Sequence, residues 1–553
     1  MDLLPHWRGR ERFVVFDTDW GDGSAFAAWV AAWRADPQRP AHLHVIAIAR
    51  AGSGLPGFRR VLQPDQAVTL DLLNPVPHMP IDAALAQLAA RIDAVHLHGL
   101  EDAGGGFARA LARLLAPGAV LHADGLRAQH SAALATTGWA FGSANEARYA
   151  SRKPFAAVAP APERRAIVIG AGLAGAAACE RLCARGWNVT LVERHPQAAM
   201  EASGNLAGIT MPLLSKDDNI ASRLSRAAYL FALDYWQSLG GVGAGAAIDG
   251  ARCGVLLVAK DAAHAGLQRA IACARDLPPW YAEWFDSEAA ARFGPLAPHG
   301  AWLFPQGGWM RPASACQAML DACGPKLQRR FGVGSVGLER IGKEWRVVDS
   351  NDNVIAQAPT VIIANGAGAN HLAQAAFLPL ARVRGQVTHL DADASGLPPD
   401  LTLVLCREAY LTPAYQGVRC AGATYDDDDD PDLRASSQQQ NLDKLGSMLG
   451  STLTDAPLRG RVGFRSVAPD RLPLVGALPD PEFAVGAERL RELPRQSGLY
   501  GLLGYASRGL TWAPLAAELL AASLEAEPLP LETSLAAALD PGRFQLRARR
   551  GQK

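Results

Sequence analysis

The stretch IVIGAGLAG, residues 167–175, restricts the fold more than any other part of the chain. An apolar run is followed at once by Gly170, Gly172 and Gly175, then by an alanine-rich segment and a second apolar run that ends at Glu193. In such a pattern Gly170 permits a tight turn, Gly172 admits a pyrophosphate and Gly175 lets the helix pack closely. Glu193 is placed to accept hydrogen bonds from a ribose diol, which disfavours NADP. The stretch predicts a Rossmann-type dinucleotide-binding domain.

A second glycine cluster lies near the C-terminus, within residues 498–521. Its pattern predicts a strand, a turn containing Gly504 and Gly509, and a helix. Such a helix can direct its N-terminus at the electron-rich pyrimidine end of a flavin. The two clusters together favour FAD over NAD, although ordinary tight packing also explains these two glycines.

The N-terminal part has a different pattern. The stretch FVVFDTDWGDGSAF, residues 13–26, has the pattern of a first strand followed by a nucleotide loop. Alternating strand and helix signals after it predict a parallel, doubly wound α/β sheet. An Ala- and Pro-rich stretch then separates the two glycine loops. We therefore expect a domain over residues 1–150, a linker over 151–164 and a second domain over 165–553.

Composition limits the function classes. The 553 residues carry a formal net charge of zero, which gives no global attraction to nucleic acid. The eight cysteines lack zinc-ligand spacing, so we expect reduced thiols, no metal site and a cytoplasmic protein. Residues 1–12 have no apolar core, and no uncharged stretch is long enough to span a membrane. The acidic run DDDDDPD, residues 426–432, is interpreted as a mobile, solvated loop.

Several stretches of the second domain carry a family resemblance. From residue 167 onward the chain resembles the D-amino-acid-oxidase-like flavoproteins. More narrowly, it is similar to the FAD-dependent half of the bifunctional tRNA 5-methylaminomethyl-2-thiouridine biosynthesis family. The stretches that carry this resemblance are ASGNLAGITMPLLSKDD, FPQGGWMRPA, IIANGAG, VRGQVTHL, VLCREAYLTP, GFRSVAPDRLPLVGALPD and GYASRGLTWAPLAAELLA.

The resemblance implies two steps at the wobble uridine of tRNA. An FAD domain, with a Rossmann part and an α+β substrate part, removes the carboxymethyl group from 5-carboxymethylaminomethyl-uridine, leaving the aminomethyl base and glyoxylate. A methyltransferase-like N-terminal domain then uses S-adenosylmethionine to methylate that amine. The first substrate is in effect an N-substituted glycine, so the protein must hold its carboxylate and orient one carbon at the flavin.

Three residues are candidates for the reaction site. A bidentate arginine suits a carboxylate, and Arg465 matches the segment where glycine- and sarcosine-oxidising relatives carry one. Arg508 is the second candidate, because the family pattern places its turn beside the flavin ring. Tyr410 is expected to close the pocket. The alternatives are a salt bridge from Arg465 to Asp470, a helix-start contact for Arg508 and a core position for Tyr410.

Further contacts follow from the resemblance. Ser203, Gly204 and Asn205 are expected against the cofactor. Trp309 is expected either to stack on the uracil base or to sit in the core. The candidates for tRNA phosphate contacts are the basic residues of the tail and linker, with a solvated tail as the alternative: Arg543, Arg547, Arg549, Arg550, Lys553, Arg152, Lys153, Arg164 and Arg165.

The N-terminal domain departs from the family pattern. Asp19 stands at the first glycine position of the S-adenosylmethionine loop, and Asp22 adds negative charge. Ala49 replaces the acid that binds the ribose, and His98 begins the run that normally reads Asp-Gly-Phe-Ala-Pro. We therefore expect a methyltransferase-like fold that binds S-adenosylmethionine poorly or not at all, with Glu101 or Asp102 as substitutes for the lost Asp.

Three functions remain in competition at this level. The first is a tRNA-modifying flavoenzyme that works as a monomer. The second is an oxidase of free glycine, sarcosine or D-amino acids. The third is a non-catalytic, FAD-bound RNA-binding protein. The stretches PLLSK and PQGGW and the attached methyltransferase-like domain favour the first.

Overall fold

The structure is a computed structural model that describes residues 2–49, 54–65, 67–75, 79–98, 104–150, 160–161, 163–453, 457–482 and 487–550. The chain forms two compact units. Unit 1 comprises Met1–Pro162 with Ala521–Ala536, and unit 2 comprises Glu163–Leu520 with Ala537–Lys553. The unit boundary near residue 162 lies at the end of the expected linker, most of which falls outside the described residues. Among the described helices, none is long and apolar enough to cross a membrane.

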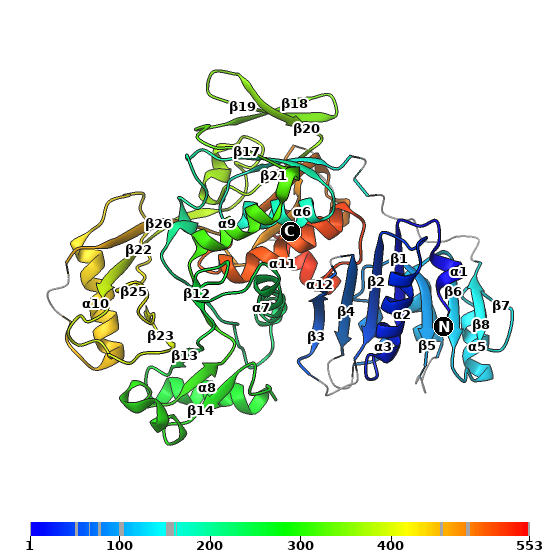
Figure 1. Ribbon diagram of the computed structural model, residues 1–553, viewed down its shortest axis with the longest axis horizontal. Coiled ribbons are helices and arrows are strands. Elements are labelled where there is room, and N and C mark those ends of the chain that lie inside the picture. The colour runs from blue at the N-terminus through cyan, green and yellow to red at the C-terminus, as the bar shows by residue number, and fades with distance from the viewer. Residues whose placement is uncertain are drawn as a thin grey trace. The chain divides into compact units, whose positions relative to one another are not determined.

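Unit 1 is built on one twisted sheet. The central strands are parallel, and a hairpin lies at each edge. In spatial order the strands are β3 (Gly57–Leu62), β4 (Val68–Asn74), β2 (His42–Ile48), β1 (Arg12–Asp17), β5 (Ile92–Leu97), β6 (Leu115–Ala123), β8 (Glu146–Tyr149) and β7 (Trp139–Phe141) (Figure 1). The helices of this part are α1 (Leu4–Trp7), α2 (Ser24–Ala35), α3 (Ile81–Leu85), α4 (Gly105–Ala112) and α5 (Ala128–Ala135).

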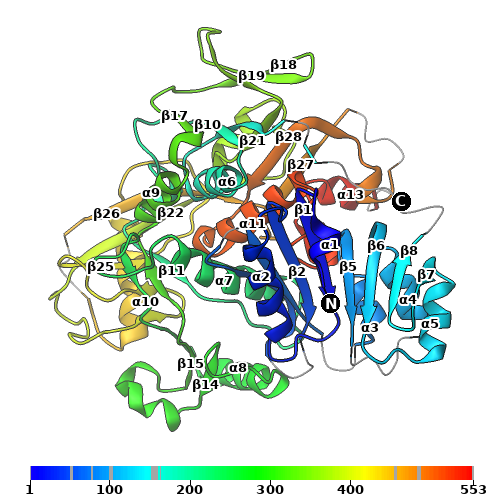
Figure 2. The same ribbon diagram turned by 45° about the vertical axis from the view of Figure 1, so that its right-hand side comes forward.

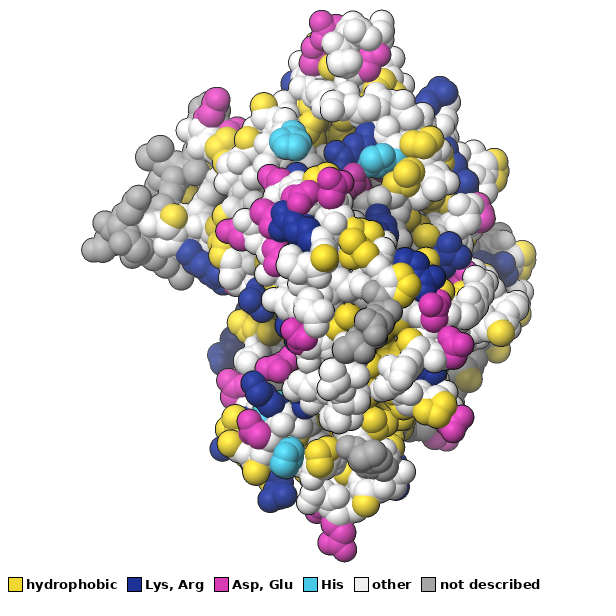
Figure 3. All heavy atoms as spheres, turned by 90° about the vertical axis from the view of Figure 1, so that its left-hand side faces the viewer, with side chains coloured by type: hydrophobic (Ala, Val, Ile, Leu, Met, Phe, Trp, Pro, Cys, Tyr) yellow, Lys and Arg dark blue, Asp and Glu magenta, His cyan; other side chains and the backbone are white. Residues whose placement is uncertain are grey.

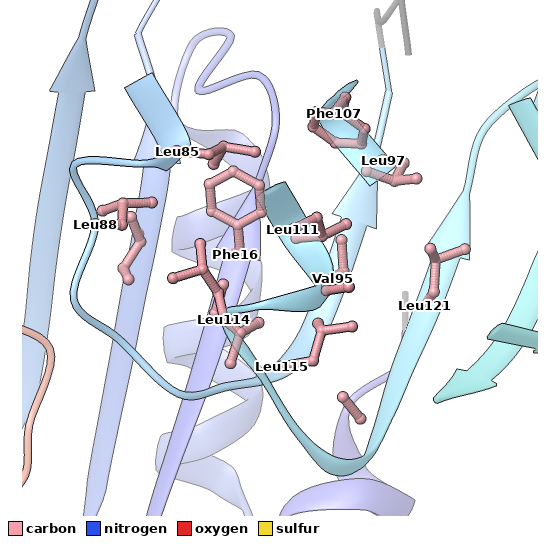
Figure 4. Close-up of a cluster of buried hydrophobic side chains, with 14 of the residues drawn as sticks. Phe16, Leu85, Leu88, Val95, Leu97, Phe107, Leu111, Leu114, Leu115 and Leu121 are labelled. Atoms are coloured by element: carbon pink, nitrogen blue, oxygen red, sulfur yellow. The ribbon is translucent and has the colours of Figure 1, made fainter. Parts of the chain in front are cut away.

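The nearly continuous apolar residues of the central strands fill a core on each side of the sheet. Phe16 and Val95 point to one side and are fully buried against helix residues such as Leu85 and Leu111 (Figure 4). Phe13 and its neighbours point to the other side and pack against α2. A sheet buried on both faces is what near-continuous hydrophobic strands predict. The predicted doubly wound, methyltransferase-like α/β sheet is confirmed.

Unit 2 contains a Rossmann-type sheet. Its strands, in spatial order, are β17 (Leu327–Arg330), β10 (Asn188–Val192), β9 (Arg165–Ile169), β21 (Thr360–Ile363), β28 (Arg495–Leu503) and β27 (Leu474–Pro479). The segments for β9, β21 and β28 come from widely separated parts of the sequence, yet they pair in parallel. Helices α6 (Leu173–Ala184) and α11 (Gly509–Leu524) lie side by side next to this sheet (Figure 2).

A second, mixed sheet forms the substrate part of unit 2. Its strands, in spatial order, are β14 (Glu283–Phe285), β15 (Ala301–Phe304), β13 (Val255–Val258), β23 (Val404–Cys406), β24 (Tyr410–Leu411), β25 (Val418–Gly422), β22 (Ala381–Asp391) and β26 (Gly460–Val467). Helix α10 (Ala435–Leu449) packs on β22 and β25. The predicted combination of a Rossmann-type domain and an α+β substrate domain is confirmed.

The remaining elements connect these layers. Two small sheets consist of β11 (Gly208–Thr210), β16 (Gly308–Met310) and β12 (Gly250–Ala251), and of β18 (Gly337–Ile341), β19 (Glu344–Val348) and β20 (Val354–Ala358). The other helices are α7 (Ile220–Ser238), α8 (Ala262–Ala274), α9 (Pro312–Ala322), α12 (Thr533–Leu539) and α13 (Arg543–Arg550).

The segment Ala521–Ala536 belongs to unit 1 although it follows the flavin-domain sequence. Arg60 on β3 donates a 2.7 Å hydrogen bond to the carbonyl of Pro528 and is held in turn by Asp71. Arg12 donates to Glu527 at 2.9 Å. The expected single domain over residues 165–553 therefore differs from the observed unit 2 by this one segment.

Candidate active site

The glycine loop connects β9 to α6 as the sequence predicts. Gly170 has a φ of +103°, and a Cβ there would lie 2.7 Å from the Cα of Asn365. A Cβ on Gly175 would lie 1.8 Å from the carbonyl oxygen of Gly170. Gly172 is the N-cap of α6, where the first N–H groups have no partner within the helix. This close backbone turn with a positive helix end fits the pyrophosphate of FAD.

Two side chains border this loop. Glu193 follows β10, is buried, and accepts hydrogen bonds from the N–H groups of Ala171 at 2.7 Å and His195 at 2.9 Å. Ser203 accepts a 3.1 Å hydrogen bond from the N–H of Leu173, in the first turn of α6. Both residues therefore lie at the carboxyl edge of the sheet, where the strand order reverses and ligands bind in such folds.

The segment containing Gly204 and Asn205 is fastened by one arginine of the substrate sheet. Arg461 on β26 donates to the carbonyl of Glu201 at 2.7 Å and to Oδ1 of Asn205 at 3.2 Å. A Cβ on Gly204 would lie 2.4 Å from its guanidinium. The sequence did not reveal Arg461, which joins the expected cofactor segment to the strand that carries Arg465.

The C-terminal glycine cluster brings a second helix end to the same place. Gly504 has a φ of +73°, and a Cβ there would touch Leu474 at 3.0 Å. Gly509 begins α11, and its added Cβ would lie 2.9 Å from the side chain of Leu173 on α6. Both glycines thus have a packing reason, and the close approach at Gly509 also sets the two helix N-termini side by side.

Arg465 lies half-buried on β26. Its Nη1 donates to the carbonyl oxygens of Thr424 at 3.1 Å and Arg384 at 3.3 Å, and its guanidinium lies 4.3 Å from the ring centre of Tyr425. Burial lowers the pKa of Arg465 below its usual value, and the nearby Tyr425, Tyr410 and Asp426 offset the loss of water only in part. The alternative of a salt bridge to Asp470 is wrong, since Arg543 and Arg547 bind that carboxylate.

Space for this guanidinium comes from Gly385 on the neighbouring strand β22. A Cβ at Gly385 would lie 2.1 Å from Nη1 of Arg465. A glycine inside a strand often marks such a close approach. The glycine inside the expected strand VRGQV could have indicated this close approach from the sequence alone.

Arg508 lies in the turn before α11. Its main-chain carbonyl accepts hydrogen bonds from Thr511 and Trp512, as a helix-start residue does, while its side chain donates to the carbonyl of Met211 at 3.1 Å. Burial lowers the pKa of Arg508 as well. Among the residues that the structure describes, neither Arg508 nor Arg465 forms an ion pair.

Tyr425 links the two arginines and was not found from the sequence. Its ring lies against Arg465, and its hydroxyl is 3.2 Å from Oγ of Ser507, the residue before Arg508. The strand of Arg465 also joins this turn directly, because Ala506 donates a 2.9 Å hydrogen bond to the carbonyl of Ser466. Tyr410 on β24 is half-buried, and burial raises the pKa of its hydroxyl.

The acidic run after Tyr425 is fixed by arginines. Arg384 is fully buried and binds Asp426 at 3.1 Å, and Arg434 binds Asp428 and Asp430 at 2.8 and 2.7 Å. Figure 3 shows acidic side chains next to basic ones on the side of the molecule that carries α10. The interpretation as a solvated loop is therefore incomplete. Asp427, Asp429 and Asp432 are exposed, whereas Asp426, Asp428 and Asp430 are half-buried and form ion pairs with arginines.

Two of the residues expected to contact RNA, Trp309 and Arg543, are buried. Trp309 is 4% exposed and packs edge-on against Tyr415, so its position is that of a core residue. In the tail, Arg543 is buried and α13 is anchored on Asp470 through Arg543 and Arg547. The side chains of Arg549, Arg550, Lys553, Arg152 and Lys153 lie outside the described residues.

The N-terminal loop is held by backbone and side-chain hydrogen bonds of its own. The N–H of Trp20 donates a 2.7 Å hydrogen bond to the carbonyl of Ile48, so the loop folds over the end of β2, beside the buried Ala49. Asp19 accepts from the N–H of Gly21 at 3.0 Å, and Asp22 from that of Ser24 at 2.9 Å. The expected substitutes Glu101 and Asp102 lie outside the described residues.

Comparison with known proteins agrees with this geometry. Residues 165–523 match the family described as FAD dependent oxidoreductase. The crystal structure of glycine oxidase from Geobacillus kaustophilus covers 68% of this chain and 99% of its own, with a TM-score of 0.55 and 20% identity. Iminodiacetate oxidase from Chelativorans sp. BNC1 covers 66% of this chain and 96% of its own, with a TM-score of 0.52 and 23% identity. At these identities the likeness concerns the fold.

The glycine loop, the paired helix ends and this match define an FAD-dependent oxidoreductase. The tRNA 5-methylaminomethyl-2-thiouridine biosynthesis bifunctional protein of Azoarcus sp. (strain BH72) is 40% identical, covering 99% of this chain and 92% of that protein. Its counterpart in Burkholderia ambifaria (strain MC40-6) is 39% identical, covering 100% and 93%. The chain belongs to this family of bifunctional proteins.

Proposed function

We propose that this protein modifies the wobble uridine of tRNA in the cytoplasm. In the proposed reaction, unit 2 removes the carboxymethyl group from 5-carboxymethylaminomethyl-(2-thio)uridine and leaves 5-aminomethyl-(2-thio)uridine and glyoxylate. The relatives are named for the biosynthesis of tRNA 5-methylaminomethyl-2-thiouridine and match along almost the whole chain. Their named role therefore supports this substrate over free amino acids.

The observation that carries the proposal is the pair of half-buried arginines without a carboxylate partner. A buried, unpaired guanidinium is costly, and an entering anion offsets that cost. Arg465 and Arg508 are linked through Tyr425 and Ser507, next to the N-termini of α6 and α11. This arrangement suits the carboxylate of an N-substituted glycine held beside a flavin.

In the proposed mechanism the chain binds and orients its substrate. Bound FAD supplies the two-electron oxidation of the carbon between the amine nitrogen and the carboxylate, and water then hydrolyses the imine to amine and glyoxylate. Arg465 fixes the carboxylate, and Arg508 adds positive charge from the turn before α11. Tyr410 and Tyr425 narrow the pocket, so that the reacting carbon is held in one orientation.

The second step of the family is methylation of the new amine. We propose that unit 1 performs it weakly or not at all, because it lacks the usual S-adenosylmethionine contacts. The side chain of Asp19 occupies the first glycine position of the loop, and Ala49 stands where an acid should bind the ribose. The hydrogen bond from Trp20 to Ile48 supports this reading, since it folds the loop over that position.

Mass spectrometry of wobble nucleosides tests both steps. Substrate tRNA is incubated with the purified, FAD-loaded chain, with and without S-adenosylmethionine. We expect the 5-aminomethyl nucleoside in both reactions. Complete conversion to the 5-methylaminomethyl nucleoside when S-adenosylmethionine is present would contradict a weak or lost methyl-transfer step. Absence of any product, together with rapid oxygen uptake on free glycine or sarcosine, would favour the amino-acid oxidase.

Tyr425 offers a graded test of the pocket. Tyr425→Phe keeps the ring against Arg465 and loses the hydroxyl contact to Ser507, so we expect about a fivefold fall in kcat/KM, near 1 kcal/mol. Tyr425→Ala also removes the ring contact and should cost about a further tenfold. The measurement is carboxymethyl removal from tRNA, with Tyr415→Phe as the control. Equal rates for both Tyr425 variants would refute a role for the ring.

A further inference from the structure

Three side chains of metal-ligand type meet at the carboxyl ends of β1 and β5 in unit 1. Oδ1 of Asp17 lies 2.7 Å from Nε2 of His98 and 3.5 Å from Nδ1 of His96. One ligand atom from each of the three lies within 4.8 Å of the others. Zn–N and Zn–O bonds of about 2.0–2.2 Å put tetrahedral ligand atoms about 3.3 Å apart, which lies between the two measured separations.

The surrounding backbone holds these residues in place. The N–H of Thr18 donates to the carbonyl of His96 at 3.1 Å, and its hydroxyl donates to the carbonyl of His98 at 2.9 Å. The N–H of His98 in turn donates to the hydroxyl oxygen of Thr18 at 2.9 Å. Thr18 therefore ties the end of β1 to the end of β5. The cluster is built on two paired strands rather than on a loose loop.

His96 carries the observation that points to a ligand. The residue is 7% exposed, and its Nδ1 is buried without a hydrogen-bond partner among the described residues. That nitrogen faces Asp17, whereas Nε2 lies 3.5 Å from the carboxylate of Asp124. An imidazole that presents one nitrogen to a metal and the other to a carboxylate is the usual arrangement of metal-bound histidine.

The position of the cluster in the sheet agrees with a ligand site. The strand order β4-β2-β1-β5-β6 reverses direction at β1, and Asp17 is its last residue. Ligands of open α/β sheets bind outside the carboxyl ends of the strands at such a reversal. The side chain of His98 is 28% exposed, so one side of the cluster is open to solvent while Asp17 and His96 form its buried wall.

We propose that Asp17, His96 and His98 bind a divalent transition-metal ion of the zinc class. Two imidazoles and one carboxylate are a ligand set for such ions, and an open fourth position is what three protein ligands leave. Asp124 orients His96 from the side away from the metal. The expected absence of metal sites, drawn from cysteine spacing, does not bear on this cluster, which contains no cysteine.

The test is zinc binding by the untagged, full-length chain after treatment with a chelator. Competition with a chromophoric chelator should reveal one tight equivalent of Zn²⁺. His98→Ala and Asp17→Asn should each weaken that binding at least about tenfold, whereas His6→Ala, at an exposed site on α1, should leave it unchanged. His98→Cys should restore most of the affinity, because thiolate is also a zinc ligand.

A second readout separates coordination from a structural role. Co²⁺ added to the metal-free chain should give visible absorption bands that shift in His98→Cys and disappear in His98→Ala. Circular dichroism and FAD content should match the wild type in each variant, which keeps a folding defect apart from lost ligation. Failure of the wild type to bind one equivalent of Zn²⁺, or equal zinc affinity in His98→Ala and wild type, would overturn the proposal.

Discussion

Replacing Arg465 by alanine should lower kcat/KM for carboxymethyl removal by about 30- to 4,000-fold and leave FAD bound. Removal of one partner of a buried, hydrogen-bonded charge pair costs about 2–5 kcal/mol, and each 1.4 kcal/mol is a factor of ten. The partner here is the substrate carboxylate, because the described residues provide none. The rate of product formation on tRNA and the flavin absorbance of the purified variant are the two measurements.

Arg346→Ala is the matched control for this variant. Arg346 lies on β19 and donates to Gln357 at the surface, so its loss removes the same charge far from the pocket. We expect its kcat/KM to stay within twofold of the wild type. Arg465→Lys keeps the charge without the forked geometry and should recover only part of the activity. Turnover of Arg465→Ala equal to that of the control would remove Arg465 from the mechanism.

Gly175→Ala should abolish stable FAD binding. The new Cβ would lie 1.8 Å from the carbonyl oxygen of Gly170, so α6 must move away from the loop that it presents to the pyrophosphate. We expect at least a tenfold weaker affinity for FAD, which corresponds to about 1.4 kcal/mol. Flavin stoichiometry after gel filtration and titration of the apoprotein with FAD measure this loss.

Gly266→Ala provides the same chemical change without the clash. Gly266 lies in α8, where no atom comes within 4 Å of an added Cβ, and alanine is the better helix former by about 1 kcal/mol. This variant should bind FAD like the wild type and melt at an equal or higher temperature. Normal flavin content in Gly175→Ala would show that the loop tolerates a side chain, against the packing argument.

The sequence was sufficient for the cofactor half because its signals are local. Gly170, Gly175 and Glu193 lie within 24 residues of one another. The two glycines stand where a Cβ would clash, and Glu193 stands at the end of a strand where its carboxylate can accept hydrogen bonds. The pocket was less predictable. Arg465 was identified through the resemblance. Gly385 reaches it from the neighbouring strand β22 and Tyr425 from the segment that follows β25, and only the folded sheet brings the three together.

The partners of the charged segments could not be predicted from the sequence. A run such as residues 426–432 is solvated unless cations are built around it, and its cations Arg384 and Arg434 come from a strand and a helix start. In the tail, Arg543 and Arg547 bind Asp470, a contact that their position in the sequence does not reveal. The cluster of Asp17 and His96 was missed for the same reason, since about 80 residues separate its members.

Residues 521–536 belong to unit 1, so the two units cannot be separated at one point of the sequence. Arg60 hydrogen-bonds Pro528, Arg12 binds Glu527, and Ala161 donates to Leu524 at 2.7 Å. A protein that ended after residue 162 would therefore lack residues 521–536, which pack on the sheet of unit 1. A protein that began at residue 163 would contain residues 521–536 without the sheet on which they pack. Because the two units alternate along the sequence, neither can be separated from the other by a single cut in the chain. Unit 1 therefore depends on a segment that the chain reaches only after the flavin-domain sequence.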